Sequence, residues 1–192
     1  MSVTTSQVQK IRKGGVWGRN ITSCIIAFAI VGVSVICLLA AMGGVQGSTI
    51  SMGPYKFPST ALEPWSARVY VLSMLAAFGA MAIASLYLIR AVFTDLALGN
   101  IFCEANVRRI RNLGWLAIAI GVYYWLIPVT YAAYAMLAGP LDFTSRDEPT
   151  FYVGIGQIVS GGLYILLSWI MAVGLGVRED AEELRRDAEL VI

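Results

Sequence analysis

The sequence predicts an all-α integral membrane protein: a four-helix bundle with a cytoplasmic helical hairpin extension and a cytoplasmic C-terminal helix. Three observations support this fold class. First, hydrophobic residues make up 58% of the 192-residue chain and charged residues 14%, whereas about a quarter of the residues in a soluble domain are charged. Second, four apolar stretches are long enough to cross a membrane. Third, the basic residues gather on one side of those stretches.

The apolar stretches divide the chain, treated as one membrane domain over 1–192, into alternating spans and loops. None of the four contains Asp, Glu, Lys or Arg, and one ionised side chain at mid-membrane would cost roughly 2.5–3.5 kcal/mol. The expected segments are the N-terminus 1–20, first span 21–42, outer loop 43–68, second span 69–89, hairpin 90–112, third span 113–138, second outer loop 139–150, fourth span 151–177 and tail 178–192.

The distribution of Lys and Arg predicts the orientation of the spans. The N-terminus, the hairpin and the tail carry eleven of the 14 basic residues: Lys10, Arg12, Lys13, Arg19, Arg90, Arg108, Arg109, Arg111, Arg178, Arg185 and Arg186. The two outer loops carry only Lys56, Arg68 and Arg146. Because basic flanks stay in the cytoplasm, we expect both termini there. The first span is longer than the roughly 7–15 apolar residues of a cleavable signal peptide, so we interpret it as a signal anchor.

The composition weighs against several function classes. Histidine, the commonest metal ligand and general base, is absent. Cys24 and Cys37 lie on one expected helix, about 20 Å apart, and Cys103 falls in a cytoplasmic segment, where thiols stay reduced. The spans also lack the ionisable residues that ion-coupled transport uses. We therefore expect no metal, no cofactor, no enzymatic activity and, at a net charge of +2, no nucleic-acid partner.

Small residues and tyrosines mark the expected contacts between spans. Small residues let helix backbones approach in lipid, and the candidates are Ala76, Gly79, Ala80, Ala84, Gly156, Ser160, Gly161 and Gly162. We expect these faces to pack within one chain, with dimerisation as the alternative. Pro128 is expected to kink the third span by freeing the carbonyl of Tyr124.

Four tyrosines of the third span need hydrogen-bond partners, which Gln157 and Ser160 of the fourth span are expected to supply. Two interpretations remain open. One is a packed core whose hydroxyls satisfy each other, which we favour. The other is a pocket for a lipid or small amphipathic ligand, lined by Tyr123, Tyr124, Tyr131, Tyr134 and Gln157.

The second span is expected to continue as a helix to a stop at Gly99-Asn100, about 45 Å from its start at Val69. Cys103 or Asn100 then caps the next helix, and Glu104 lies in its first turn. An apolar stripe follows at Val107, Ile110, Gly114 and Ile118, with Phe93, Leu96 and Phe102 expected to pack against it. Arg108, Arg109 and Arg111 lie off the stripe, facing phosphates of lipid headgroups or the carboxylates of Asp95 and Glu104.

The candidate motif of the hairpin comprises Gly99, Phe102, Asn106, Arg108, Arg109 and Arg111. Its first interpretation is structural: Asn106 bonds the Gly99-Asn100 turn and Phe102 fills the hairpin. Its second interpretation is a rigid basic tip that a protein partner binds.

The tail and the first outer loop carry further patterns. In the tail "REDAEELRRDAELVI", a thin apolar stripe runs along Ala181, Leu184, Ala188 and Val191, and Glu182 and Arg186 form a favourable pair. We expect this stripe to lie against the hairpin, with docking to another protein as the alternative. In the outer loop, "STISM" and "YKF" are expected to pair as short strands across Gly53-Pro54.

The segments "GNIFCEANVRRIRNLGW" and "REDAEELRRDAELVI" resemble the bacterial membrane-protein family called domain of unknown function 2975. The residues that match its pattern after the second span are Gly99, Phe102, Asn106, Arg109, Ile110 and Gly114. Two features depart from the family: Cys103 replaces the usual Ser or Thr cap, and "AELVI" replaces an ending in "LTV". The resemblance implies a four-span protein of the bacterial inner membrane, often encoded beside a small helix-turn-helix regulator, without an assigned activity.

The patterned, charged segments thus lie on the cytoplasmic side, whereas the spans carry no ionisable residue. The leading hypothesis is a membrane interaction, sensing or accessory protein that acts through its hairpin and tail. The alternative is a binder or carrier of a lipid or small amphipathic ligand in the tyrosine-lined pocket. The expected partners are membrane lipids and a cytoplasmic or membrane protein.

Overall fold

The computed structural model describes residues 2–42, 49–52, 55–58, 64–99, 103–139, 144–145 and 150–190. Its four helices are α1 (Ser2–Ala41), α2 (Trp65–Leu98), α3 (Glu104–Ala138) and α4 (Thr150–Leu190). Its three short strands are β1 (Thr49–Met52), β2 (Tyr55–Pro58) and β3 (Thr144–Ser145). All four helices are long and apolar enough to cross a membrane, so the predicted fold class is confirmed.

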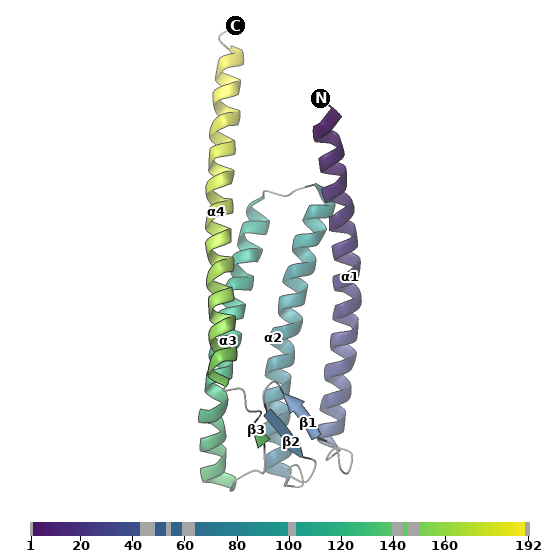
Figure 1. Ribbon diagram of the computed structural model, residues 1–192, viewed down its shortest axis with the longest axis vertical. Coiled ribbons are helices and arrows are strands. Elements are labelled where there is room, and N and C mark those ends of the chain that lie inside the picture. The colour runs from purple at the N-terminus through teal and green to yellow at the C-terminus, as the bar shows by residue number, and fades with distance from the viewer. Residues whose placement is uncertain are drawn as a thin grey trace.

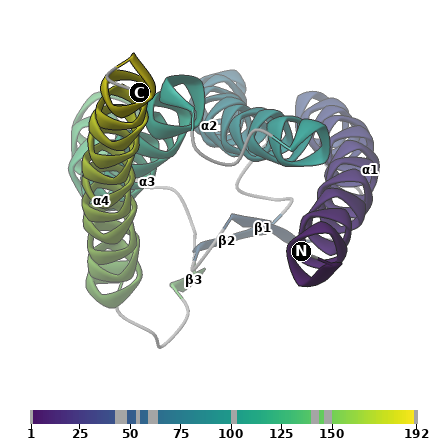
Figure 2. The ribbon, with the colours of Figure 1, turned by 90° about the horizontal axis from the view of Figure 1, so that it is seen from above.

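Consecutive helices run antiparallel and lie side by side (Figure 1). The start of α1, the end of α2, the start of α3 and the end of α4 lie at one end of the molecule, called here the hairpin end, and the strands lie at the opposite, sheet end. Viewed along the helices, the four form an open arc, with α1 and α4 at its two ends and the sheet beside its open side (Figure 2). The N-terminal segment, which the sequence left without an assigned structure, is part of α1.

Glycines of α1 and α2 let these two helices pack closely. A Cβ atom on Gly15 would lie 2.5 Å from the backbone nitrogen of Ala97, and one on Gly18 would meet the ring of Phe93. Gly79 of α2 is buried against Val33. Phe93 was expected to pack against the apolar stripe of α3, but its ring lies against Gly18 of α1.

A second set of glycines, called here the glycine seam, joins α3 to α4: Gly114 and Gly121 on α3, Gly154 and Gly161 on α4. A Cβ on Gly114 would lie 2.7 Å from the carbonyl oxygen of Gly161, and one on Gly121 would lie equally close to that of Gly154. The two glycines on each helix are seven residues, or two turns, apart and therefore lie on the same face of that helix. Each glycine of α3 thus lies opposite a glycine of α4. Ser168, seven residues beyond Gly161, is fully buried on the same side of α4.

The predicted small-residue faces were therefore only partly right. Ala76, Ala80 and Ala84 are exposed, and it is Gly79 that is buried. On α4, Gly156 and Gly162 have no neighbour among the described residues where a Cβ would point, whereas Gly161 does. The sequence offered several possible contact faces on each helix, because every face of a membrane span is apolar. The face that makes the contact is the one where the two backbones come closest.

The two loops at the sheet end are joined by a small antiparallel sheet in the order β1-β2-β3. Thr49 pairs with Pro58 and Met52 with Tyr55, which confirms the predicted strand pair. The third strand, from the loop before α4, was not predicted: Tyr55 pairs with Ser145. It contains only two residues, too few for an alternating pattern to be visible in the sequence.

Candidate functional site

The turn that ends α2 has the predicted geometry. Gly99 adopts a left-handed conformation with φ of 87°, and its N–H group points at the carbonyl oxygens of Asp95 and Leu96. This conformation favours glycine because a Cβ would clash with the backbone. The predicted stop at Gly99 is confirmed, whereas Asn100 and Phe102 lie outside the described residues.

Helix α3 begins after Cys103, as predicted, but the cysteine side chain does not cap it. Cys103 has the extended backbone of a cap residue, and the N–H groups of Asn106 and Val107 donate to its carbonyl oxygen at 3.0 and 3.2 Å. Its Sγ atom instead lies 3.8 Å from a carboxylate oxygen of Asp95. The expected acidic residue of the first turn, Glu104, is in place.

Arg109 links the two helices of the hairpin. Its guanidinium forms an ion pair with Asp95 of α2. The same group donates to the carbonyl oxygen of Ala91 at 3.3 Å and to Oδ1 of Asn106 at 3.2 Å. Asn106 is only 1% exposed. This half of the motif is structural, since it fixes α3 against α2 next to the turn.

Arg108 and Arg111 point away from that network. Both are exposed and line a surface hollow of about 300 Å³ between α3 and α4, together with Val107, Glu104 and Glu179. The hollow contains two guanidinium and two carboxylate groups, so its charges balance. The candidate motif is thus divided: Asn106 and Arg109 hold the hairpin, and Arg108 and Arg111 face its surface.

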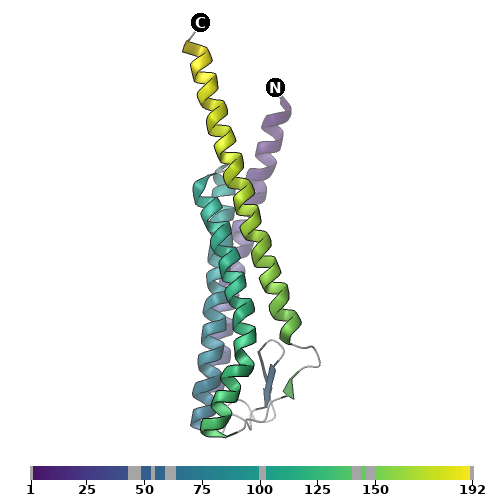
Figure 3. The same ribbon diagram turned by 90° about the vertical axis from the view of Figure 1, so that its left-hand side faces the viewer.

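Beyond this hollow, α4 continues past the end of α2 and the start of α3 into open space (Figures 1 and 3). Residues 178–189, called here the projecting helix, are all exposed, and Leu184 is 70% exposed. The expected contact between the tail stripe and the hairpin is therefore wrong for Leu184 and Ala188, because α4 is straight and leads its stripe away from α3. Val191 lies outside the described residues. Glu182 pairs with Arg178 at 2.9 Å, not with Arg186.

Three of the four tyrosines of α3, Tyr123, Tyr124 and Tyr134, contact α2, not α4 as predicted. The hydroxyl of Tyr123 donates to the carbonyl oxygen of Met74 at 2.8 Å, and that of Tyr134 lies 3.0 Å from Oγ of Ser66. Tyr124 is buried with its ring against Phe78. Ser160, an expected partner, donates within its own helix to Gly156.

These contacts favour the packed-core interpretation of the tyrosine cluster over the pocket. Tyr131 is half-buried on α3, and Gln157 is half-buried on α4. Pro128 lies inside a helix that continues to Ala138.

Replacing Tyr123 with phenylalanine tests this interpretation. Because the substitution removes only the hydrogen bond to Met74, we expect a loss of about 0.6 kcal/mol in unfolding free energy, typical for one such bond between membrane helices. Unfolding of the purified protein by SDS, followed by tryptophan fluorescence, measures the change. A neutral effect on stability together with loss of a bound lipid would instead support a ligand pocket.

Four membrane-length apolar helices, two of which (α2 and α3) are joined by an ion pair, define a multi-pass membrane protein of the all-α class. The family described as "Protein of unknown function (DUF2975)" matches residues 52–192. The chain belongs to this family, which confirms the resemblance drawn from its hairpin and tail. No curated protein and no solved structure shows a match to the chain.

Proposed function

We propose that this protein is a non-enzymatic interaction or sensing protein of the bacterial inner membrane, and that a protein partner binds its projecting helix. The observation that carries this proposal is the exposure of residues 178–189, which extend from the hollow lined by Glu179 away from α3. The excess of Lys and Arg at the hairpin end supports a cytoplasmic location for both termini and for this helix.

The energetics of the projecting helix favour a partner. Its two ion pairs, Arg178–Glu182 and Arg185–Glu189, are each spaced four residues apart and well exposed, and such pairs contribute only a few tenths of a kcal/mol each. Leu184 contributes no burial energy while it is exposed. A helix that lies against Ala181, Leu184 and Ala188 would bury this stripe.

The charge of the projecting helix defines the chemistry of that partner. Six carboxylates face three guanidinium groups within residues 178–189, so the surface is acidic. A complementary partner is an amphipathic helix with Lys or Arg beside its apolar stripe. Like charges would repel an acidic partner, which gives the surface selectivity.

Leu184→Asp tests the proposal without removing the helix. A carboxylate in the centre of the apolar stripe should lower the recovery of a stoichiometric partner at least about tenfold, since desolvating the charge costs more than 1.4 kcal/mol. The measurement is quantitative mass spectrometry of proteins that co-purify with the chain after gentle solubilisation.

The matched control is Glu183→Gln, which removes one charge but keeps Leu184. We expect recovery within about twofold of the unchanged protein, because single exposed charges contribute little. If removal of residues 178–192 leaves the set and amounts of co-purifying proteins unchanged, the projecting helix is not a docking surface.

A further inference from the structure

A second surface at the hairpin end is formed by arginines of three different helices. Arg19 of α1, Arg90 of α2 and Arg109 of α3 line a hollow of about 410 Å³, together with Tyr87, Thr94 and Asp95. The three cations are far apart in the sequence and come together only through the packing of α1, α2 and α3. This hollow is called here the arginine pocket.

The charges of the arginine pocket do not cancel. Asp95 neutralises Arg109, with which it is paired. Arg90 donates from Nε to the hydroxyl oxygen of Ser23 at 2.9 Å, and this neutral contact orients its guanidinium without neutralising it. Within the described part of the chain, no carboxylate pairs with Arg19. The pocket therefore holds two uncompensated positive charges, one of them already held in place.

The position of the pocket along the helices matches the level of lipid headgroups. Arg19 lies two residues before the first expected span, Arg90 directly follows the second, and Arg109 lies four residues before the third. Tyr87, 49% exposed, lies just inside this level, where amphipathic aromatic side chains are favoured. Basic pockets between membrane helices at this depth bind anionic headgroups.

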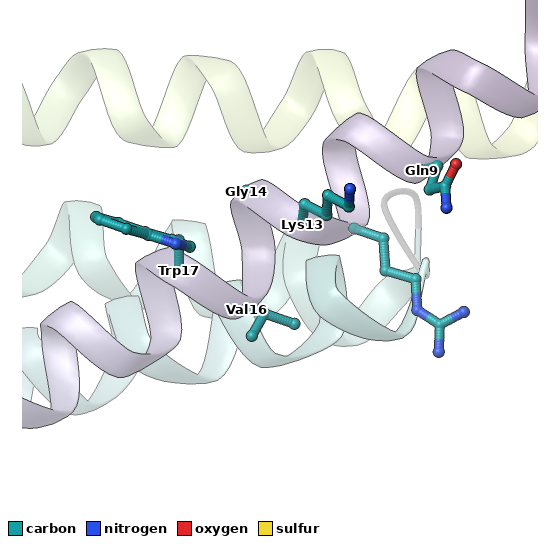
Figure 4. A pocket seen from close by; sticks show the side chains of 6 residues that line it. Gln9, Lys13, Gly14, Val16 and Trp17 are labelled. Carbon is teal, nitrogen blue, oxygen red and sulfur yellow. The ribbon is translucent and has the colours of Figure 1, made fainter.

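A larger hollow, of about 670 Å³, lies along residues 9–17 in the N-terminal half of α1 (Figure 4). Gln9, Lys13 and Trp17 line it, and Trp17 is 73% exposed. Its described lining comes from one helix, so packing between helices does not fix the spacing of its cations. The arginine pocket, by contrast, holds its cations on three packed helices.

We propose that the arginine pocket binds the phosphate of an anionic phospholipid, with Arg19 and Arg90 as its charged contacts. The planar guanidinium groups suit bidentate bonding to phosphate oxygens. The acyl chains of the same lipid would lie along the apolar surfaces of α1 and α2 that continue from the pocket towards the sheet end. This proposal is independent of the partner of the projecting helix.

The test compares lipids retained by the full-length protein from vesicles of phosphatidylcholine and phosphatidylglycerol in equal amounts. Native mass spectrometry in mild detergent gives the ratio of the two bound lipids. In the Arg19→Gln variant we expect the preference for phosphatidylglycerol to fall about fivefold, the effect of removing one basic contact. Arg19 donates to no described side chain, so the variant should retain its unfolding temperature in detergent without added lipid.

The matched control is Arg108→Gln, which removes an exposed arginine of the same end outside the pocket. We expect its lipid preference to be unchanged. Equal losses in both variants, or no loss in either, would overturn the proposal, because the attraction would then come from diffuse charge. Glycerol phosphate tests whether the pocket binds a soluble phosphate in place of a lipid. If glycerol phosphate raises the unfolding temperature as much as phosphatidylglycerol does, the pocket binds a soluble phosphate and not a lipid.

Discussion

Replacing Gly161 with leucine is expected to separate α3 from α4 and to lower the unfolding free energy by about 3 kcal/mol. A Cβ on Gly161 would lie 2.6 Å from the carbonyl oxygen of Gly114 and 3.0 Å from the backbone nitrogen of Ile118. Because both contacts are to backbone atoms, no side-chain rotation relieves them. Thermal unfolding in detergent micelles, followed by tryptophan fluorescence, measures the effect.

The neighbouring Gly162 provides a matched control for this prediction. Apart from its chain neighbours and the backbone of its own helix, no atom of the described residues lies within 4 Å of the place where its Cβ would be. Gly162→Leu is therefore expected to leave the unfolding temperature unchanged or to raise it slightly, since leucine favours helix more than glycine. If the two variants unfold at the same temperature, the glycine seam is not the contact between α3 and α4.

Replacing Arg109 with methionine is expected to cost about 2 kcal/mol and to loosen the hairpin. The variant leaves the carboxylate of Asp95, whose side chain is 18% exposed, without its cation. It also removes the donor to Oδ1 of the buried Asn106. Titration with SDS at a fixed concentration of a mild, non-denaturing detergent gives the change in the free energy of unfolding.

Two further variants give this prediction its controls. Arg108→Met removes an exposed arginine one position away and is expected to change the free energy by less than about 0.5 kcal/mol. Combining Asp95→Asn with Arg109→Met should cost less than the sum of the two single changes, because neither charge is then left alone. If the loss of unfolding free energy in the double variant equals the sum of the losses in the two single variants, Asp95 and Arg109 do not interact.

The helices and the turn between α2 and α3 were predictable because their signals are local. Uncharged apolar runs of span length permit few structures in a membrane, and Gly99 marks a left-handed stop that other residues adopt with difficulty. The strand pair of the first loop was predictable for a similar reason: β1 and β2 are adjacent in sequence and separated by Gly53-Pro54.

The contact faces were harder to predict because they depend on the neighbours of each helix. Arg108 and Arg109 are adjacent, about 100° apart around α3, and only the positions of α2 and α4 decide which one is paired. The tyrosines were placed against α4 for the same reason, although Tyr123, Tyr124 and Tyr134 contact α2. The seven-residue spacing of Gly114 and Gly121, matched by Gly154 and Gly161, was a usable signal for the α3–α4 contact.

The division within the hairpin motif has a consequence for function. Asn106 and Arg109 match the family pattern and serve the fold, so substitutions there would reduce binding of any partner through instability. Surface positions such as Arg108, Arg111 and Leu184 are better sites for functional tests, because they are exposed and contribute little to packing.

The proposal that the projecting helix binds a protein is tested most directly by photocrosslinking in living cells. A photoreactive amino acid is placed at Leu184 and, as a comparison, at Trp169, which is 62% exposed within the fourth apolar span. We predict a discrete protein adduct from position 184 that is absent from position 169. If position 184 yields no protein adduct, or the same adducts as position 169, the projecting helix is not the contact surface.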